Sequence, residues 1–155
     1  MDVEQVAPAA HVGLALAALL IGAWVLGATK GTSRHRALGT GYVVALVALN
    51  VAALLVHREA TFGVFHVLAV VSLLTVMAGF VPMKIRAKSP PRIARHGYFM
   101  AWSYAGLVAA GCGQLAASAV DGGRVTVLTA VAIVLAVSAV VIHWRVPRIL
   151  ASLEQ

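Results

Sequence analysis

Five long apolar segments constrain this chain more than any other feature of its sequence. They lie near residues 8–29, 36–57, 62–82, 93–117 and 124–142. A helix needs about 20 residues to cross a hydrocarbon core of about 30 Å. Because lipid offers no hydrogen-bond partners, each segment must pair its own backbone N–H and C=O groups, as a helix does. The alternation of polar and apolar residues that is typical of a β-barrel is absent. With 61% hydrophobic and 11% charged residues, the chain is predicted to be an all-α, polytopic membrane helix bundle of five transmembrane helices.

Most basic residues lie in alternate connections between these segments. Ten of the twelve Lys and Arg residues fall in the first connection, in the third connection or after the last segment. The positive-inside rule therefore predicts an outer N-terminus and an inner C-terminus, in a multi-pass protein of the plasma membrane. This topology and anionic lipid headgroups account for the net charge of +7, so no nucleic-acid partner is expected. The acidic start does not resemble a cleaved signal peptide.

The first four segments form two similar hairpins. Each opens with His-Val, at His11 and His66, and turns back through Arg-His, at His35 and His96. Internal repeats in membrane proteins often mark a pseudo-two-fold axis with the functional site near it. The predicted single transmembrane domain, residues 1–155, consists of hairpin repeat 1 at 8–57, hairpin repeat 2 at 62–117 and a cover helix at 124–149.

The four repeated histidines are predicted to meet in two pairs, one near each membrane surface. Imidazoles on facing helices are suitable axial ligands for haem b, which has two open axial positions. Two such sites would form an electron path across the membrane, although helix rise places them roughly 25 Å apart. Arg36 and Arg95 could neutralise haem propionates at the inner face. The predicted ligand pairs are His11 with His66 and His35 with His96.

Polar side chains continue the helix faces of the two inner histidines. Tyr42 and Asn50 follow His35 at helical spacing, and Gln114 follows His96. A polar side chain within a membrane span needs a partner, so both amides are expected to face the interior. At that depth they could orient the outer ligands. The face of His11 continues through small residues that permit close approach, namely Ala15, Ala18 and Gly22.

Two alternatives to haem stay open. His11, His66 and His57 could form a three-imidazole site for zinc or copper, in a hydrolase, an oxidase or a metal carrier, and Met100 could add a soft ligand near His96. The chain could instead be a small accessory subunit of a larger membrane complex. Expected partners are the lipid bilayer, a quinone or redox protein, and a homo-oligomer or larger complex.

Other sequence features exclude several functions or need no special role. The chain has no Ser-His-Asp order, no paired buried carboxylates, no phosphate-binding glycine loop and no cysteine cluster. Cys112 is expected to be a packed thiol. His57 and His143 stand beside charged residues at helix ends, and His143 adjoins Trp144. Both are therefore expected to lie at a membrane interface.

The second apolar segment opens with the sequence HRALGTGY, from His35 to Tyr42. This resembles the His-Arg-x-x-Gly-x-x-Tyr motif of an uncharacterised, domain-of-unknown-function family of bacterial multi-pass membrane proteins. The resemblance covers about residues 8–115 and implies no established activity; Gly97 departs from it where an Arg is expected. More distantly, the arrangement is similar to four-helix di-haem b-type cytochromes, which implies electron transfer across a membrane. The further counterparts are His11 before a small-residue helix, Phe65-His66, and His96 with Met100.

Overall fold

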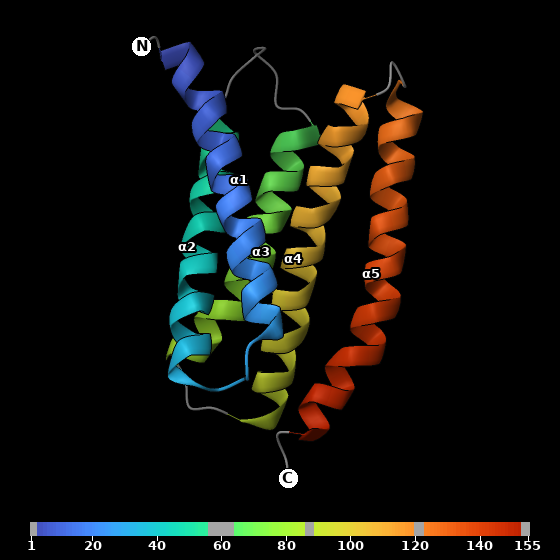
Figure 1. Ribbon diagram of the computed structural model, residues 1–155. Coiled ribbons are helices and arrows are strands. Elements are labelled where there is room, and N and C mark those ends of the chain that lie inside the picture. The colour runs from blue at the N-terminus through green and yellow to red at the C-terminus, as the bar shows by residue number, and fades with distance from the viewer. Residues whose placement is uncertain (1–2, 56–63, 86–88, 120–122, 153–155) are drawn as a thin grey trace. The chain divides into compact units, whose positions relative to one another are not determined.

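The computed structural model describes residues 3–55, 64–85, 89–119 and 123–152. Within these ranges every regular element is a helix and none is a strand, which confirms the all-α prediction. The helices follow one another along the chain (Figure 1). They are α1 (Val3–Gly27), α2 (Ser33–Leu55), α3 (Val64–Ile85), α4 (Pro90–Ala119) and α5 (Arg124–Ser152).

Four of the five helices are long and apolar enough to span a membrane, and their side chains therefore contact lipid. The exception is α4, which has 30 residues and is long enough, but is not among the helices of sufficient mean hydropathy. Arg92 and Arg95 stand near its start and Gln114 near its end. That α4 also crosses the membrane stays a prediction. The four candidate spans are Ala9–Gly27, Ser33–Leu54, His66–Ile85 and Arg124–Ser152.

The connection between α1 and α2 is closed by side chains that bond to backbone groups. Gly31 adopts φ 79°, a left-handed conformation that glycine tolerates best. The Thr32 hydroxyl accepts a hydrogen bond from the backbone N–H of His35 at 3.1 Å, which caps the start of α2. The Lys30 ammonium closes the other end, and burial lowers the pKa of Lys30. Its Nζ donates to the carbonyls of Val25, Leu26 and Ala28 at 3.0, 2.7 and 3.1 Å.

The chain divides into two compact units, residues 1–74 and 75–155. In the first unit α1 and α2 run antiparallel, and the first half of α3 runs in the direction of α1 (Figure 1). Ala18 is fully buried, while Tyr42 and Leu46 are 2% and 1% exposed. The boundary between the units lies inside α3, whereas the predicted hairpins separate between residues 57 and 62. The division into hairpin repeats stays a prediction.

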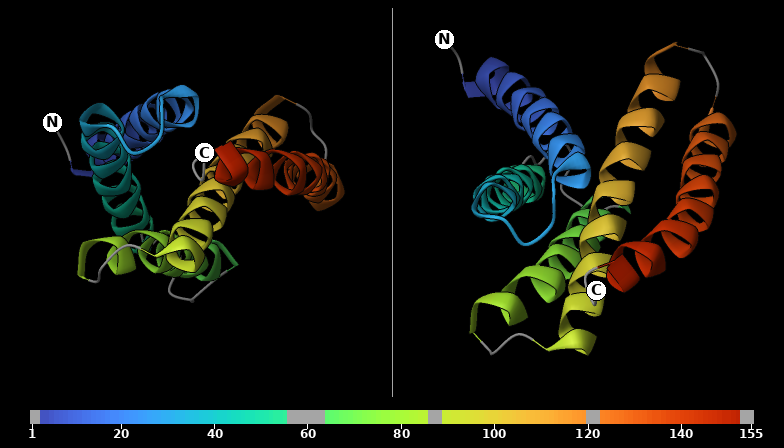
Figure 2. Two further views of the ribbon diagram at one scale, coloured as in Figure 1. Left: turned by 90° about the horizontal axis from the view of Figure 1, so that it is seen from below. Right: turned by 60° about the horizontal axis from the view of Figure 1, so that its bottom comes forward.

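In the second unit α4 lies between the end of α3 and the whole of α5 (Figure 2). Its contact with α5 includes a buried cluster of Ala105, Ile142 and Val146. α5 ends at Ser152, beyond the apolar segment predicted to end near residue 142 and three residues beyond the cover helix predicted at 124–149. Tyr98, Ala101 and Leu150 pack against the same cluster. α4, which does not reach the mean hydropathy of the four candidate spans, is thus shielded on two sides, by α3 and by α5.

Candidate histidine site

The face of α1 that carries His11 is its buried face. His11 and Ala15 are half-buried, and Ala18 and Gly22 are buried, whereas Leu16 on the opposite side is exposed. Small side chains permit this close packing because they let helix backbones approach one another. The predicted small-residue stripe is therefore confirmed as an interior surface of the first unit.

The predicted face of α2 is also buried. His35 is half-buried at the start of the helix, and Tyr42 and Asn50 are buried further along it. The Asn50 amide donates to the Leu46 carbonyl at 2.8 Å and to the Ser72 hydroxyl of α3 at 3.1 Å. The prediction that Asn50 faces the interior and finds a partner is confirmed. Ser72 was not predicted; its signal in the sequence is that it is one of two hydroxyl residues, with Thr75, in an otherwise apolar run.

His66 lies near the start of α3, on the side that becomes buried. It is half-buried, and Ala69 and Val76, which share its face, are buried. In the first unit α1 and α3 begin at the same end while α2 begins at the other (Figure 1). His11 and His66 therefore stand toward one end and His35 toward the opposite end. This agrees with the predicted layers; ligation by His11 and His66 stays a prediction.

His96 is oriented by a hydrogen bond to the backbone of α3. Its Nδ1 lies 2.9 Å from the carbonyl oxygen of Gly79. A carbonyl can only accept, so Nδ1 carries the proton and donates it, which leaves the lone pair of Nε2 open in the neutral ring. Histidines that bind metals commonly donate their second ring N–H in this way.

Gly79 is the residue that lets α4 approach α3 closely enough for this bond. A Cβ at this position would lie 2.8 Å from Cβ of Phe99 and 3.2 Å from Sδ of Met100. Only glycine therefore fits without a shift of one helix. Gly79 was not predicted from the sequence; its signal is a glycine within an apolar segment, three residues before Pro82.

The remaining predicted site residues lie in more exposed positions. Gln114 is exposed, unlike Asn50, so the prediction that both amides face the interior is wrong for Gln114, which lies near the end of α4. Arg36 and Arg95 are exposed as well, and Nη1 of Arg36 donates to the Gly31 carbonyl at 2.8 Å. His35 and His96 belong to different units, and their pairing stays a prediction.

The described residues offer no group of three or more His, Cys, Asp or Glu side chains that could hold a metal ion. The three-imidazole alternative depends on His57, which lies outside the described residues. A bis-histidine haem site needs two donors only, and this finding leaves that prediction untested. His143 is exposed and Cys112 is half-buried with a free thiol, as expected for an interfacial residue and a packed one.

Comparison with known proteins identifies a family but no characterised relative. No curated protein and no solved structure matches the chain. The family described as "Predicted membrane protein (DUF2306)" matches residues 8–151, which include α5 as well as the region of the expected resemblance. None of these comparisons matches the chain to b-type cytochromes. The chain therefore belongs to the DUF2306 family of membrane proteins, whose function is uncharacterised.

Proposed function

We propose that this protein is a b-type cytochrome of the plasma membrane that transfers electrons through two bis-histidine haem sites. The ligands are His11 with His66 and His35 with His96. The observation that carries the proposal is the hydrogen bond from Nδ1 of His96 to the Gly79 carbonyl, at 2.9 Å. It fixes the ring and leaves Nε2 as a ligand. Haem b held by two imidazoles supplies a reversible one-electron carrier.

The other histidines also occupy positions suited to ligation. His11, His35 and His66 are each half-buried on the interior face of their helix, among side chains that are mostly small or apolar. The Asn50–Ser72 hydrogen bond, at 3.1 Å, joins α2 to α3 and so holds the helices of His35 and His66 in a fixed register. Asn50 is therefore a positioning residue for two ligands.

Charged residues at the inner surface suit the propionates that haem carries. Arg36 and Arg95 adjoin His35 and His96 in sequence and are exposed. A guanidinium group binds a carboxylate through two parallel hydrogen bonds. A quinone or a redox protein is the expected partner at each surface. Zinc or copper at the same histidines would need a third donor, and an accessory subunit would need no ligand at all.

The proposal is tested by the haem content of histidine variants of the detergent-purified full chain. His11→Ala and His66→Ala should each lose the same haem, so the content falls by about half when two haems are bound per chain. His35→Ala and His96→Ala should each lose the other haem. The control is His143→Ala, because His143 is exposed on α5, and it should keep the full content.

Size-exclusion profiles show which variants remain folded. If either member of a pair retains full haem occupancy while folded, the pairing is wrong. If no variant and no wild-type preparation holds haem, the accessory-subunit or metal alternatives replace the proposal.

A further inference from the structure

The C-terminal part of α5 extends beyond the length that a membrane span requires. α5 has 29 residues, which corresponds to about 43 Å at 1.5 Å per residue, against a hydrocarbon core of about 30 Å. Its sequence from Val125 to Ile142 contains no charged residue, whereas Arg145 and Arg148 follow closely. Residues 143–152 therefore lie at a membrane surface, which is the inner one in the predicted orientation.

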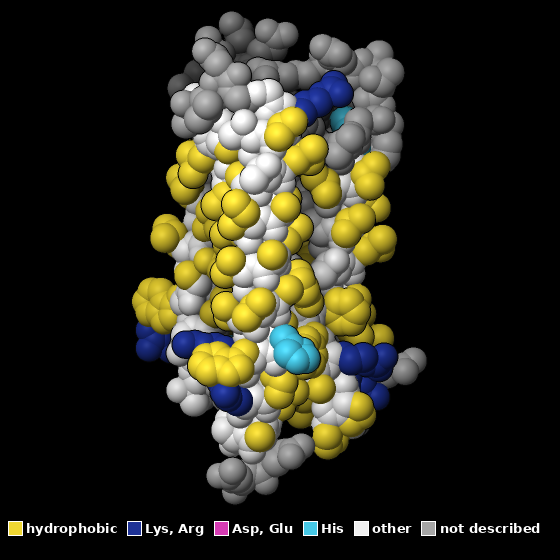
Figure 3. All heavy atoms as spheres, turned by 90° about the vertical axis from the view of Figure 1, so that its right-hand side faces the viewer, with side chains coloured by type: hydrophobic (Ala, Val, Ile, Leu, Met, Phe, Trp, Pro, Cys, Tyr) yellow, Lys and Arg dark blue, Asp and Glu magenta, His cyan; other side chains and the backbone are white. Residues whose placement is uncertain are grey.

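These last turns of α5 are held against α4. Ile142 and Val146 are buried with Ala105, and Leu150 packs against the same cluster. The spacing of four residues places these side chains on one side of the helix, so the opposite side faces away from α4. Figure 3 shows the long hydrophobic face of α5 ending in Lys and Arg side chains near its C-terminus. The exposed side chains of this end include Trp144, Arg145 and Arg148.

Arg148 is stacked on an exposed aromatic ring. Its guanidinium carbon lies 3.6 Å from the centroid of the Trp144 ring, and Trp144 is 60% exposed. Stacking holds the guanidinium plane while its N–H donors, which lie in that plane, remain available to an anion. The described part of the second unit, residues 75–85, 89–119 and 123–152, contains no Asp or Glu. No carboxylate there neutralises the arginines.

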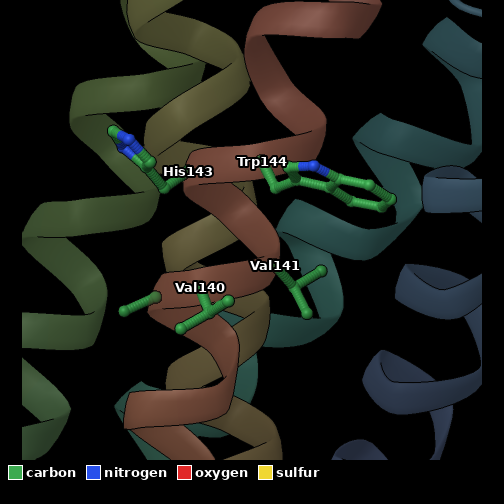
Figure 4. Close-up of a pocket in the computed structure, with 5 residues that line it drawn as sticks. Val140, Val141, His143 and Trp144 are labelled. Atoms are coloured by element: carbon green, nitrogen blue, oxygen red, sulfur yellow. The ribbon is translucent and has the colours of Figure 1, made fainter.

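An apolar hollow adjoins the stacked pair. It is lined by Ala139, Val140, Val141, His143 and Trp144, and His143 and Trp144 leave α5 on opposite sides (Figure 4). The hollow is almost wholly apolar, whereas the arginines beyond it are cationic. A ligand that satisfies both surfaces needs an anionic head and an apolar chain.

The same pairing of a cation with an aromatic ring recurs at the ends of two other spans. The guanidinium of Arg34 lies 5.0 Å from the Trp24 ring, and the ammonium of Lys84 lies 5.1 Å from the Phe80 ring. Aromatic side chains concentrate at the headgroup level of a bilayer, and basic residues there attract anionic lipids. The pair on α5 has the shortest of the three distances.

We infer that Trp144, Arg145 and Arg148 form a binding site for an anionic phospholipid of the inner leaflet. The phosphate binds to the two guanidinium groups, and an acyl chain lies along the hollow beside Trp144. This site is independent of the haem proposal, because none of its three side chains is a predicted haem ligand.

The test uses Trp144 as a fluorescent probe in a full-length variant with Trp24→Phe and Trp102→Phe. The protein is reconstituted in vesicles that contain brominated phosphatidylglycerol or brominated phosphatidylcholine, whose bromine atoms quench nearby tryptophan. Phosphatidylglycerol should quench Trp144 more strongly at equal mole fraction. Replacing Arg148 by Gln should lower the preference for phosphatidylglycerol roughly five-fold, and replacing Arg145 as well should lower it by a similar factor again.

Two further variants separate loss of the site from general damage. Arg124→Gln removes an exposed charge at the opposite end of α5 and should keep the full preference. Arg148→Lys keeps the charge and should keep most of it. Equal quenching by both lipids, or equal effects of Arg124→Gln and Arg148→Gln, would overturn the site. Inorganic phosphate should weaken the preference no more than chloride does at equal ionic strength; a larger effect would overturn the lipid assignment.

Discussion

α2 and α4 both carry an Arg-His pair near their N-terminal ends, but they lie in different surroundings. α2 is apolar enough to span a membrane, and its one mid-span amide, Asn50, is buried and bonded to Ser72. α4 does not reach that hydropathy, and its amide, Gln114, is exposed. The two helices carry the same sequence motif and differ in how their polar groups are satisfied.

The difference shows how a polar helix is accommodated in a membrane protein. α4 is packed by α3 on one side, through Gly79, and by α5 on the other, through Ile142 and Val146. Its polar groups near the middle are covered; Ser103, for example, is 3% exposed.

The largest effect should come from a side chain at Gly79. Gly79→Val should lower the free energy of unfolding by about 3 kcal/mol, because even its Cβ would meet the Phe99 Cβ at 2.8 Å. Gly39→Val in α2 is the matched control, since a Cβ there meets nothing within 4 Å. Reversible unfolding by sodium dodecyl sulfate in mixed micelles measures both. Equal stability of the two variants would show that α3 and α4 do not approach each other so closely.

Truncating one leucine in each helix should give two similar losses. Leu46 and Leu107 are 1% and 7% exposed. Leu46 follows His35 in the sequence by the same number of residues as Leu107 follows His96. Leu→Ala at either position should cost about 2 kcal/mol, at the low end of values for soluble cores, because the unfolded reference remains in lipid and mainly the cavity counts. Leu115→Ala, at a position 68% exposed, should cost almost nothing in the same assay. A neutral Leu107→Ala would mean that the middle of α4 is not packed like that of α2.

The two amides should respond differently to replacement by leucine. Asn50→Leu removes two hydrogen bonds and should cost about 0.6 to 1.7 kcal/mol, from the average to the largest value for side-chain hydrogen bonds between membrane helices. Gln114→Leu should leave stability unchanged or raise it, because Gln114 is exposed. The comparison between α2 and α4 fails if the Gln114 variant is the less stable one.

The smallest effect concerns the connection that leads into α2. Burial lowers the pKa of Lys30 below 10.5, so the folded state binds its proton less tightly than the unfolded state. The resulting penalty is complete below the folded pKa and disappears as pH rises toward 10.5. As pH rises from the folded-state pKa of Lys30 toward 10.5, the wild-type protein should therefore gain stability relative to Lys30→Met. Parallel stability curves for the two proteins at alkaline pH would contradict this.

The helices and their interior faces were predictable because both follow from local rules. Twenty apolar residues can cross a membrane only as a helix, and a spacing of three or four residues keeps side chains on one face. This is why the faces of His11 and of His35 with Asn50 were predicted correctly. The same rule placed Gln114 on the face of His96, but near the end of α4 that face is exposed. Helical spacing shows which side chains share a face. It does not show how far along the helix a neighbouring helix covers that face.

Contacts between segments were less accessible to prediction from the sequence. The partner of Asn50 depends on the register between α2 and α3, and the bond of His96 depends on a close approach at Gly79. Both are set by packing across residues distant in the chain. Whether the histidines bind a cofactor is a question of chemistry that spacing alone leaves open.

The haem proposal is tested most directly by a reduced-minus-oxidised visible spectrum of the detergent-purified protein, with elemental analysis of the same sample. We expect sharp bands typical of b-type haem, with iron at about two atoms per chain. A spectrum without such bands would contradict it. In that case, zinc or copper in stoichiometric amount would favour the metal alternative, and the absence of any metal would favour the accessory subunit.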